Sequence, residues 1–372
     1  MANVFQKLFS TGSLNIFKKD SSVLGVDFGS SSIKIIQLKN DKGRAVLETY
    51  GELSTGPYGG LAVGQAITLA PDKLSTLLKD LFKEANVTTN EVAMSIPLRS
   101  SLLVPMELPD VPGAKLEETI PIEARKYVPV PISEVALDWW VVPKLAGGQT
   151  TEGADQKPSM LEVFMVAIHK DTLKQYEEVT RLAQLSAKFF EIETFSAMRS
   201  VLTDNRGVVA IVDIGAVSTK MVVVDNGSVK LSHTINKGSQ DVTLAIARSM
   251  SITFARAEEI RRKVGLAEKV GNEGIAPTIS PIVEYIFSEV SRVMVDYQKK
   301  HRRAIDKVIL IGGGALLKGV LETAKELVDA PVEIGNPFRR VEAPAFLEKI
   351  LREIGPSFAV SIGLALRALE EI

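Results

Sequence analysis

The fold is decided by VLGVDFGSSSIKIIQL (residues 23–38) and VAIVDIGAVSTKMVVV (residues 209–224), two versions of one pattern. Each has an apolar run, then Asp-x-Gly, small or hydroxyl residues, a lysine and a second apolar run, which predicts a β-hairpin. Glycine in such a turn lets the backbone approach a bulky anion, because it has no side chain to block the way. Two facing hairpins of this kind would clamp a nucleoside triphosphate.

The polar residues of the two hairpins are those that phosphate and a hydrated Mg²⁺ require. Gly29 and Gly215 occupy the turns, and Lys34 can balance phosphate charge. Mg²⁺ prefers one or two carboxylates together with substrate phosphates, so Asp27 and Asp213 are the predicted metal ligands. The hydroxyl groups predicted to donate hydrogen bonds to phosphate are those of Ser30, Ser31, Ser32, Ser218 and Thr219.

A third motif, KVILIGGGALLKGV (residues 307–320), predicts a strand, a glycine run and the start of a helix. Gly312, Gly313 and Gly314 are expected where backbone must approach adenine and ribose, near a helix N-terminus. A flexible loop is the alternative, but the apolar strand before the glycines favours a rigid wall. A single Asp-x-Gly turn is often only a tight turn, whereas two copies followed by this motif predict a nucleotide site.

The composition indicates a soluble globular protein and excludes several classes of function. The chain has 372 residues, of which 45% are hydrophobic and 24% charged, which suggests two domains with separate cores. The net charge of −1 creates no field that would recruit nucleic acid. The absence of cysteine excludes disulfides and thiolate metal sites. No apolar run has the length of a membrane span and no signal peptide is evident, so we expect a cytoplasmic protein.

The sequence is organised in two halves with an insert. Residues 23–95 and 170–206 are predicted to form a first lobe, residues 96–169 a small strand–helix–strand–strand insert, and residues 207–355 a second lobe. Residues 1–22 are expected to form an amphipathic segment, and residues 356–372 a closing helix that packs on the core. Trp139 and Trp140 are neighbours on an insert strand, where side chains alternate, so one should face the core and the other a groove or solvent.

The order of DFGSSSIK, DIGAVSTK and IGGGALLKG resembles that of the actin, sugar kinase and heat-shock chaperone superfamily over nearly the whole chain. The insert resembles the extra subdomain of the division protein FtsA. Three stretches are similar to the PilM family of type IV pilus assembly proteins, namely residues 116–142 (LEETIPIEARKYVPVPISEVALDWWVV), VAIHKDTL and ARAEEIRRKVGL. This resemblance implies an α/β, actin-like ATPase fold of two lobes with duplicated ribonuclease-H-like cores, an FtsA-like α+β insert, and ATP between the lobes.

The resemblance also assigns roles to individual residues. It implies that Glu258 accepts hydrogen bonds from the ribose hydroxyls and that Arg261 lies against adenine, although alone they are an i, i+3 ion pair on a solvated helix. In actins a glutamine before the second hairpin orients the attacking water, and the equivalent position here is Ser196. Glu191 or Glu193 could act as a base instead, with Glu193 the candidate catalytic residue. We therefore expect firm ATP binding and slow or absent hydrolysis.

The function implied by the resemblance is that of an ATP-binding scaffold on the cytoplasmic side of the inner membrane. It would bind the N-terminal cytoplasmic peptide of the membrane protein PilN in a groove between the first lobe and the insert, contact the pilus motor ATPases and support twitching motility. It would reach the membrane through its partner and could self-associate into rings or filaments. An FtsA-like division protein is one alternative, but the sequence shows no linker and amphipathic helix after the closing helix. A small-molecule kinase is the other, and it would need a catalytic base.

Overall fold

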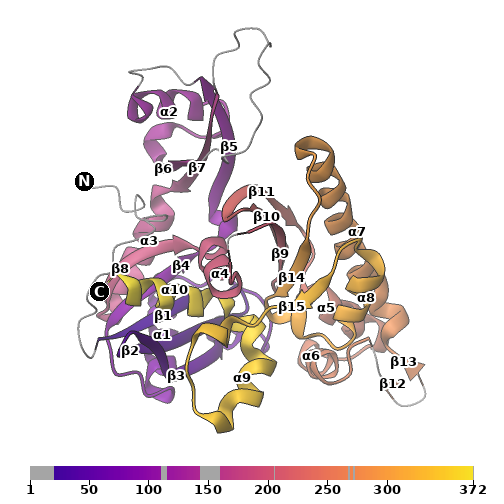
Figure 1. Cartoon of the computed structure of the whole chain (residues 1–372). Helices are drawn as coiled ribbons and strands as arrows, with labels where there is room; N and C mark the ends of the chain where they lie inside the picture. The colour runs from indigo at the N-terminus through magenta and orange to yellow at the C-terminus, as the bar shows by residue number, and fades with distance from the viewer. Residues whose placement is uncertain are drawn as a thin grey trace.

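The computed structural model describes residues 21–109, 115–142, 160–204, 206–266, 269–270 and 273–371, and all statements below concern these residues (Figure 1). Two lobes lie side by side, and a small insert rises from the first lobe. The expected α/β fold of two lobes is therefore present. The predicted amphipathic segment lies almost wholly outside the described residues.

The first lobe is built on a five-stranded sheet of order β3-β2-β1-β4-β8. β1, β2 and β3 are antiparallel neighbours, whereas β4 and β8 run parallel to β1. Apolar residues of α1 and α3 cover one face of this sheet. Its strands are β1 (Ser22–Phe28), β2 (Ser32–Asp41), β3 (Arg44–Ser54), β4 (Glu91–Ile96) and β8 (Ser186–Ile192), and its helices are α1 (Pro71–Glu84), α3 (Lys170–Ala183) and α4 (Glu193–Val201).

The second lobe repeats this plan with a sheet of order β11-β10-β9-β14-β15. Again three strands form an antiparallel meander and two further strands run parallel to the first of them. Residues of α5, α6, α7 and α8 cover one face. The elements are β9 (Val208–Ile214), β10 (Thr219–Asp225), β11 (Ser228–Ile235), α5 (Ser239–Met250), α6 (Phe254–Lys263), β12 (Lys269–Val270), β13 (Glu273–Gly274), α7 (Ala276–His301), β14 (Lys307–Ile311), α8 (Val320–Leu327), β15 (Val332–Ile334) and α9 (Glu348–Ile354).

The closing helix α10 (Ala359–Glu370) lies between the two sheets together with α4. One hydrophobic cluster joins these two helices to residues of both sheets. The helix approaches its neighbours closely at two glycines: a side chain on Gly25 of β1 would meet the Ser361 carbonyl, and one on Gly363 of α10 would meet the Ser196 carbonyl. The C-terminal helix therefore belongs structurally to the first lobe and supports the junction of the lobes.

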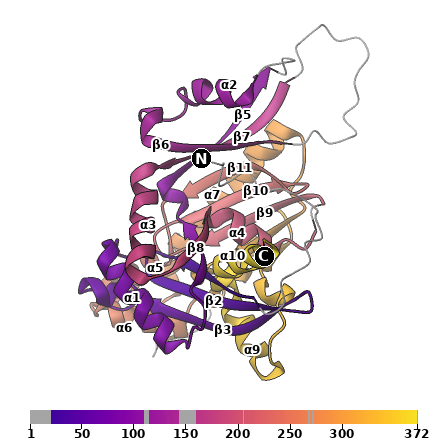
Figure 2. The same ribbon diagram turned by 90° about the vertical axis from the view of Figure 1, so that its left-hand side faces the viewer.

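The insert consists of a three-stranded antiparallel sheet of order β5-β7-β6, covered on one face by α2 (Figure 2). Its elements are β5 (Ser101–Pro109), α2 (Leu116–Ala124), β6 (Val135–Val141) and β7 (Met160–His169). Trp139 packs in the core of the insert, whereas Trp140 stacks on Phe164 and meets Phe195 of α4 edge-on. The second tryptophan thus joins the insert to the first lobe, and both tryptophans are partly exposed.

The insert also contacts the second lobe. Lys230 of β11 donates a hydrogen bond to Glu162 of β7. Both strands lie toward the end of the molecule opposite to α9 (Figure 1). Within the described residues no helix is both long enough and apolar enough to span a bilayer.

Candidate functional site

The two Asp-x-Gly hairpins form equivalent turns in the two lobes. In the first, β1 pairs with β2 so that Asp27 lies opposite Lys34. In the second, β9 pairs with β10 so that Asp213 lies opposite Lys220. The sequence spacing and the strand register are therefore the same in both hairpins, and each turn places its glycine at the end of an apolar strand.

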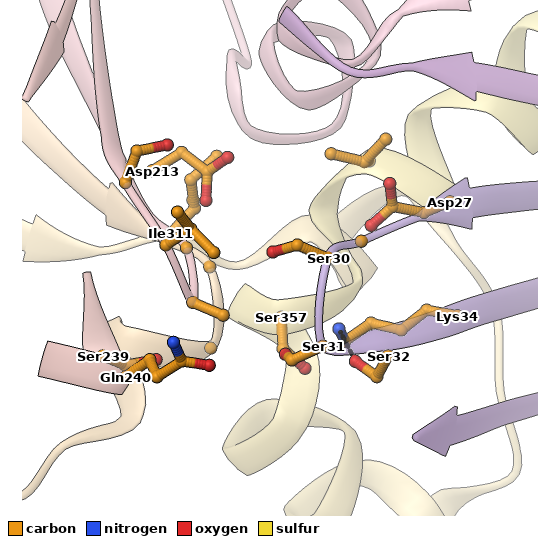
Figure 3. Close-up of a pocket in the computed structure, with 18 of the residues that line it drawn as sticks. Asp27, Ser30, Ser31, Ser32, Lys34, Asp213, Ser239, Gln240, Ile311 and Ser357 are labelled. Atoms are coloured by element: carbon orange, nitrogen blue, oxygen red, sulfur yellow. Dashed lines mark hydrogen bonds between the residues drawn. The ribbon is translucent and has the colours of Figure 1, made fainter. Parts of the chain in front are cut away.

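A cleft with a volume of about 360 Å³ lies between these turns, within the range of roughly 300–1,000 Å³ that is typical of ligand pockets. Figure 3 shows Ser30 and Ser31 of the first lobe on one side and Asp213 of the second lobe on the other. The floor is formed by the segment around Ser357, which leads into α10. The cleft thus opens between the lobes, where both hairpins contribute to its walls.

The structure gathers nearly all the predicted site residues around this cleft. The predicted residues that line it are Asp27, Gly29, Ser30, Ser31, Ser32, Lys34, Glu193, Asp213, Gly215, Ser218, Glu258, Arg261, Gly312 and Gly313. Gly314 and Thr219 lie outside the lining. A side chain on Gly314 would collide with Ile214, so this glycine serves close packing beneath the cleft. The helix expected directly after the glycines is a 3₁₀ turn, Gly313–Leu316, and α8 begins only at Val320.

Gly312 has a special backbone conformation at the cleft wall. Its φ is 86°, which glycine adopts far more readily than other residues, and a side chain there would lie 2.3 Å from Asp213 Oδ1. The glycine therefore leaves room for the Asp213 carboxylate, in addition to giving a ligand access to the backbone.

Asp27 is a buried carboxylate whose position is fixed by one hydroxyl group. Ser95 Oγ donates to Asp27 Oδ1 at 3.0 Å and itself accepts from the backbone N–H of Phe28. Burial raises the pKa of Asp27 to about 6, against the opposing effect of the Lys34 ammonium. The carboxyl group is thus held at the base of the cleft with part of its population protonated near neutral pH.

Lys220 joins the carboxylates of the two lobes. Its Nζ lies 2.8 Å from Glu193 Oε2 and 3.4 Å from Asp213 Oδ2. Burial by itself would lower the pKa of Lys220, but the negative charges of Glu193 and Asp213 outweigh that effect and raise it, so the lysine is positively charged. Sequence reasoning missed this residue, although its spacing from Asp213 repeats that of Lys34 from Asp27.

Glu193 is occupied on both of its carboxylate oxygens. Oε1 accepts from the backbone N–H of Leu98 at 2.6 Å, and Oε2 accepts from Lys220. Leu98 lies in the short 3₁₀ turn that leads from β4 into β5 of the insert. Glu193 therefore connects the second-lobe hairpin to the root of the insert.

Ser196 and Glu191 have structural environments. Ser196 Oγ donates to Glu191 Oε2, and the same carboxylate accepts from Arg199 and from Arg367 of α10. Burial would raise the pKa of Glu191, but the two guanidinium groups lower it. Glu191 lies outside the lining of the cleft, so the hypothesis that it acts as a base finds no support in the geometry.

Glu258 and Arg261 form a buried pair in the cleft wall, not an ion pair on a solvated helix face. The Glu258 carboxylate accepts from Arg261, Arg262 and Thr243, with two hydrogen bonds on each oxygen. Burial would raise its pKa, but these donors lower it to about 2. A ribose hydroxyl must therefore displace one of the present donors to reach this carboxylate.

A first-lobe loop closes over this end of the cleft. The backbone N–H of Ala66 donates to Gln240 Oε1 of α5 at 2.7 Å, and Gly64 approaches the Glu258 side chain. Gln240, Ser239, Arg262 and Ser357 also line the cleft and were not predicted. Nothing in their local sequence marks them, because they reach the cleft only through tertiary packing.

A lysine side chain occupies part of the predicted magnesium site. Among the described side chains, no group of three or more His, Cys, Asp or Glu residues is arranged to hold a metal. The space between Asp213 and Glu193 is taken by the Lys220 ammonium. A Mg²⁺ ion in direct contact with Asp213 would therefore have to displace Lys220, and the predicted contact of Asp27 and Asp213 with a hydrated Mg²⁺ stays a prediction.

The two mirrored sheets and the cleft between their hairpins define the class of the protein, an actin-like ATPase fold. Solved structures agree: MreB 5 of Spiroplasma citri bound to AMPPNP shares this fold with a TM-score of 0.50 and 13% identity, over 95% of this chain and 98% of that one.

The chain belongs to the type IV pilus assembly protein PilM family, whose profile matches residues 25–369. A solved PilM-PilN type IV pilus biogenesis complex is 26% identical, with a TM-score of 0.77 over 93% of this chain and 98% of that chain. Cell division protein FtsA of Streptococcus pneumoniae serotype 2 is a more distant relative, 20% identical over 359 residues, covering 88% of this chain and 78% of FtsA. The similarity to PilM expected from the sequence is confirmed.

Proposed function

We propose that this pilus assembly protein is an ATP-binding scaffold of the inner-membrane platform, and that it links a PilN-type partner to the pilus motor ATPases. The observation that carries the proposal is the cleft whose two walls are the duplicated phosphate turns of opposite lobes. A triphosphate bound there touches both lobes at once. Its binding energy then stabilises one relative arrangement of the lobes.

The partner would be the N-terminal cytoplasmic peptide of a PilN-type membrane protein, which would hold the scaffold at the membrane. Support comes from the similarity to the PilM-PilN complex and from the insert itself. Among the described strands, β6 pairs with β7 alone, so its second edge is available to an extended peptide. Val141 at the end of β6 is exposed and would offer apolar contact.

The environment of Glu193 supports slow hydrolysis, because Glu193 is the candidate base predicted from the sequence that lies in the cleft wall. Glu193 is bound to Lys220 and to the Leu98 N–H, and Ser196 faces Glu191 and not the cleft. A nucleotide that is bound but rarely hydrolysed suits a scaffold. A kinase of the same superfamily would need a free base, and this arrangement argues against that alternative.

Two measurements test the proposal. The melting temperature should rise with ATP, because a ligand that binds only the folded state stabilises it. A fluorescein-labelled N-terminal peptide of a PilN-type protein should bind with higher affinity when ATP is present, whereas a scrambled peptide should not bind. An unchanged melting temperature with ATP, or rapid ATP turnover that depends on a sugar or acid substrate, would refute the scaffold.

A further inference from the structure

Lys220 is one of several basic side chains that line the cleft, together with Lys34, Arg99, Arg261 and Arg262. Lys220 Nζ contacts Glu193 and Asp213, and a β-carbon built on Gly215 would lie 4.0 Å from it. The ammonium group thus lies close to the second Asp-x-Gly turn. Its side chain is 17% exposed and lines the cleft, so the exposed part faces the ligand space.

The equivalent lysine of the first hairpin behaves differently. Lys34 Nζ donates to Ser32 Oγ at 2.8 Å and pairs with Glu52 at 3.3 Å, without a direct contact to Asp27 (Figure 3). Lys220 instead turns toward the aspartate opposite it and toward Glu193. The two hairpins have the same register but only the second places its ammonium between carboxylates.

Electrostatics explains why this difference matters. Asp27, Glu193 and Asp213 all line the cleft and would repel the phosphates, and Lys220 is in direct contact with two of these carboxylates. A lysine supplies a compact positive charge on a flexible stem with three donors, of which two are used here. The remaining donor is available to a phosphate oxygen while the carboxylates hold the lysine in place.

We propose that Lys220 is the built-in cation of this site, so that the chain binds a nucleoside triphosphate without requiring a divalent metal ion. This inference rests on the proposed function, since it concerns the same cleft. It replaces a Mg²⁺ held by Asp213 with a tethered ammonium. A charged hydrogen bond of this kind contributes about 1.5–3 kcal/mol, which corresponds to a change of about tenfold or more in affinity.

The test is calorimetric titration of the full chain with ATP, once in excess MgCl₂ and once in excess EDTA. Wild-type protein is expected to bind with affinities that agree within about threefold in the two conditions, because its own cation is always present. Lys220→Ala should lose about tenfold or more in EDTA and regain most of it in MgCl₂, since the vacated space can then hold the metal. Lys220→Arg, which keeps the charge, should remain independent of the metal.

Lys34→Ala is the matched control at the equivalent position of the first hairpin. It should weaken ATP binding to the same degree in both conditions, and an equal gain of metal dependence in this variant would overturn the special role of Lys220. Tighter ATP binding by Lys220→Ala in EDTA would also overturn the role of Lys220, because the lysine would then block the ligand space and oppose ATP binding.

The wild-type titration needs no variant, so the inference is testable even if Lys220→Ala does not fold. Wild-type protein that binds ATP only in MgCl₂ overturns this inference and leaves the proposed function intact. Protein that binds ATP in neither condition overturns both.

Discussion

Replacing Asp138 by asparagine is expected to stabilise the protein at neutral pH, although it removes a charge next to an arginine. Asp138 lies on β6 on the same side as Trp140, facing the first lobe, and is buried. Its carboxylate accepts a hydrogen bond from the backbone N–H of Trp139 at 2.9 Å. Arg367 is the nearby cation, but its guanidinium donates to Glu191 and Glu371. Asp138 therefore lacks a cation committed to it.

The magnitude and the sign follow from its pKa. Burial raises the pKa of Asp138 from 3.8 to about 6, and the Trp139 N–H and Arg367 only partly oppose this. Between those values the folded state holds a proton that the unfolded state has lost, so stability falls as pH rises through this window. At pH values above the folded pKa, Asp138 is ionised in both states and the full destabilisation from its buried charge is present. A shift of about two units corresponds to at most about 3 kcal/mol, and we expect a gain of about 1–3 kcal/mol for Asp138→Asn at pH above the folded pKa.

The assay is urea denaturation followed by tryptophan fluorescence at several pH values. The chain has two tryptophans, Trp139 and Trp140, and both adjoin the substituted residue, so the signal reports unfolding of the insert. The gain should be largest above the folded pKa and should vanish as pH falls toward the unfolded value. A variant that is less stable than wild type at neutral pH, or whose gain does not change with pH, would refute the assignment of a costly buried charge.

Three further changes test the packing and the cleft. Gly363→Ala places a methyl group against the Ser196 carbonyl and should lower the free energy of unfolding by about 3 kcal/mol or more. The readout is a lower melting temperature or loss of soluble protein, and a wild-type melting temperature would contradict the close approach. Glu191→Gln leaves Arg199 without a carboxylate and Arg367 with Glu371 alone, and it should cost about 3–5 kcal/mol in urea denaturation, so an unchanged midpoint would contradict it. The pKa of Glu258 is lower in the folded state than in the unfolded state, so the carboxylate stabilises the fold by about 2–3 kcal/mol above its unfolded pKa and loses this contribution as pH falls toward its folded pKa. Glu258→Gln should therefore flatten the fall in unfolding free energy at acid pH. An unaltered dependence of that free energy on pH would exclude this contribution.

The hairpins and the order of elements were predictable because they depend on local pattern. Apolar runs on either side of an Asp-x-Gly turn predict a hairpin from local sequence alone. The duplicated order of the strands then follows from two similar halves.

The environments of the acidic residues were not predictable, because their partners come from distant segments. Glu191 is a candidate base from its position near the second hairpin, but Arg367, its partner across 176 residues, lies on the closing helix. The sequence contains both residues and gives no sign that they meet. Similarly, the Asp138 carboxylate is expected to destabilise the fold because Arg367 of α10 donates its hydrogen bonds to Glu191 and Glu371.

Lys220 shows where sequence reasoning stopped short despite a usable signal. Its spacing from Asp213 matches that of Lys34 from Asp27, so symmetry alone places both lysines opposite an aspartate. Symmetry does not predict the partner of each lysine. Lys220 pairs with Glu193, the first residue of α4, whereas Lys34 pairs with Glu52 of β3. The two turns are equivalent in backbone and different in charge because α4 reaches one of them.

This asymmetry ties the cleft to the rest of the molecule. Glu193 bonds Lys220 of the second lobe through one oxygen and the Leu98 N–H, at the root of the insert, through the other. A ligand that draws Lys220 toward its phosphates weakens one of these contacts and leaves the other unbalanced. The insert also reaches the second lobe directly, through Glu162 and Lys230. We therefore expect movement of one lobe relative to the other to change the environment of the insert. If ATP changes the affinity of the insert for a partner by some factor, that partner changes the affinity of the cleft for ATP by the same factor.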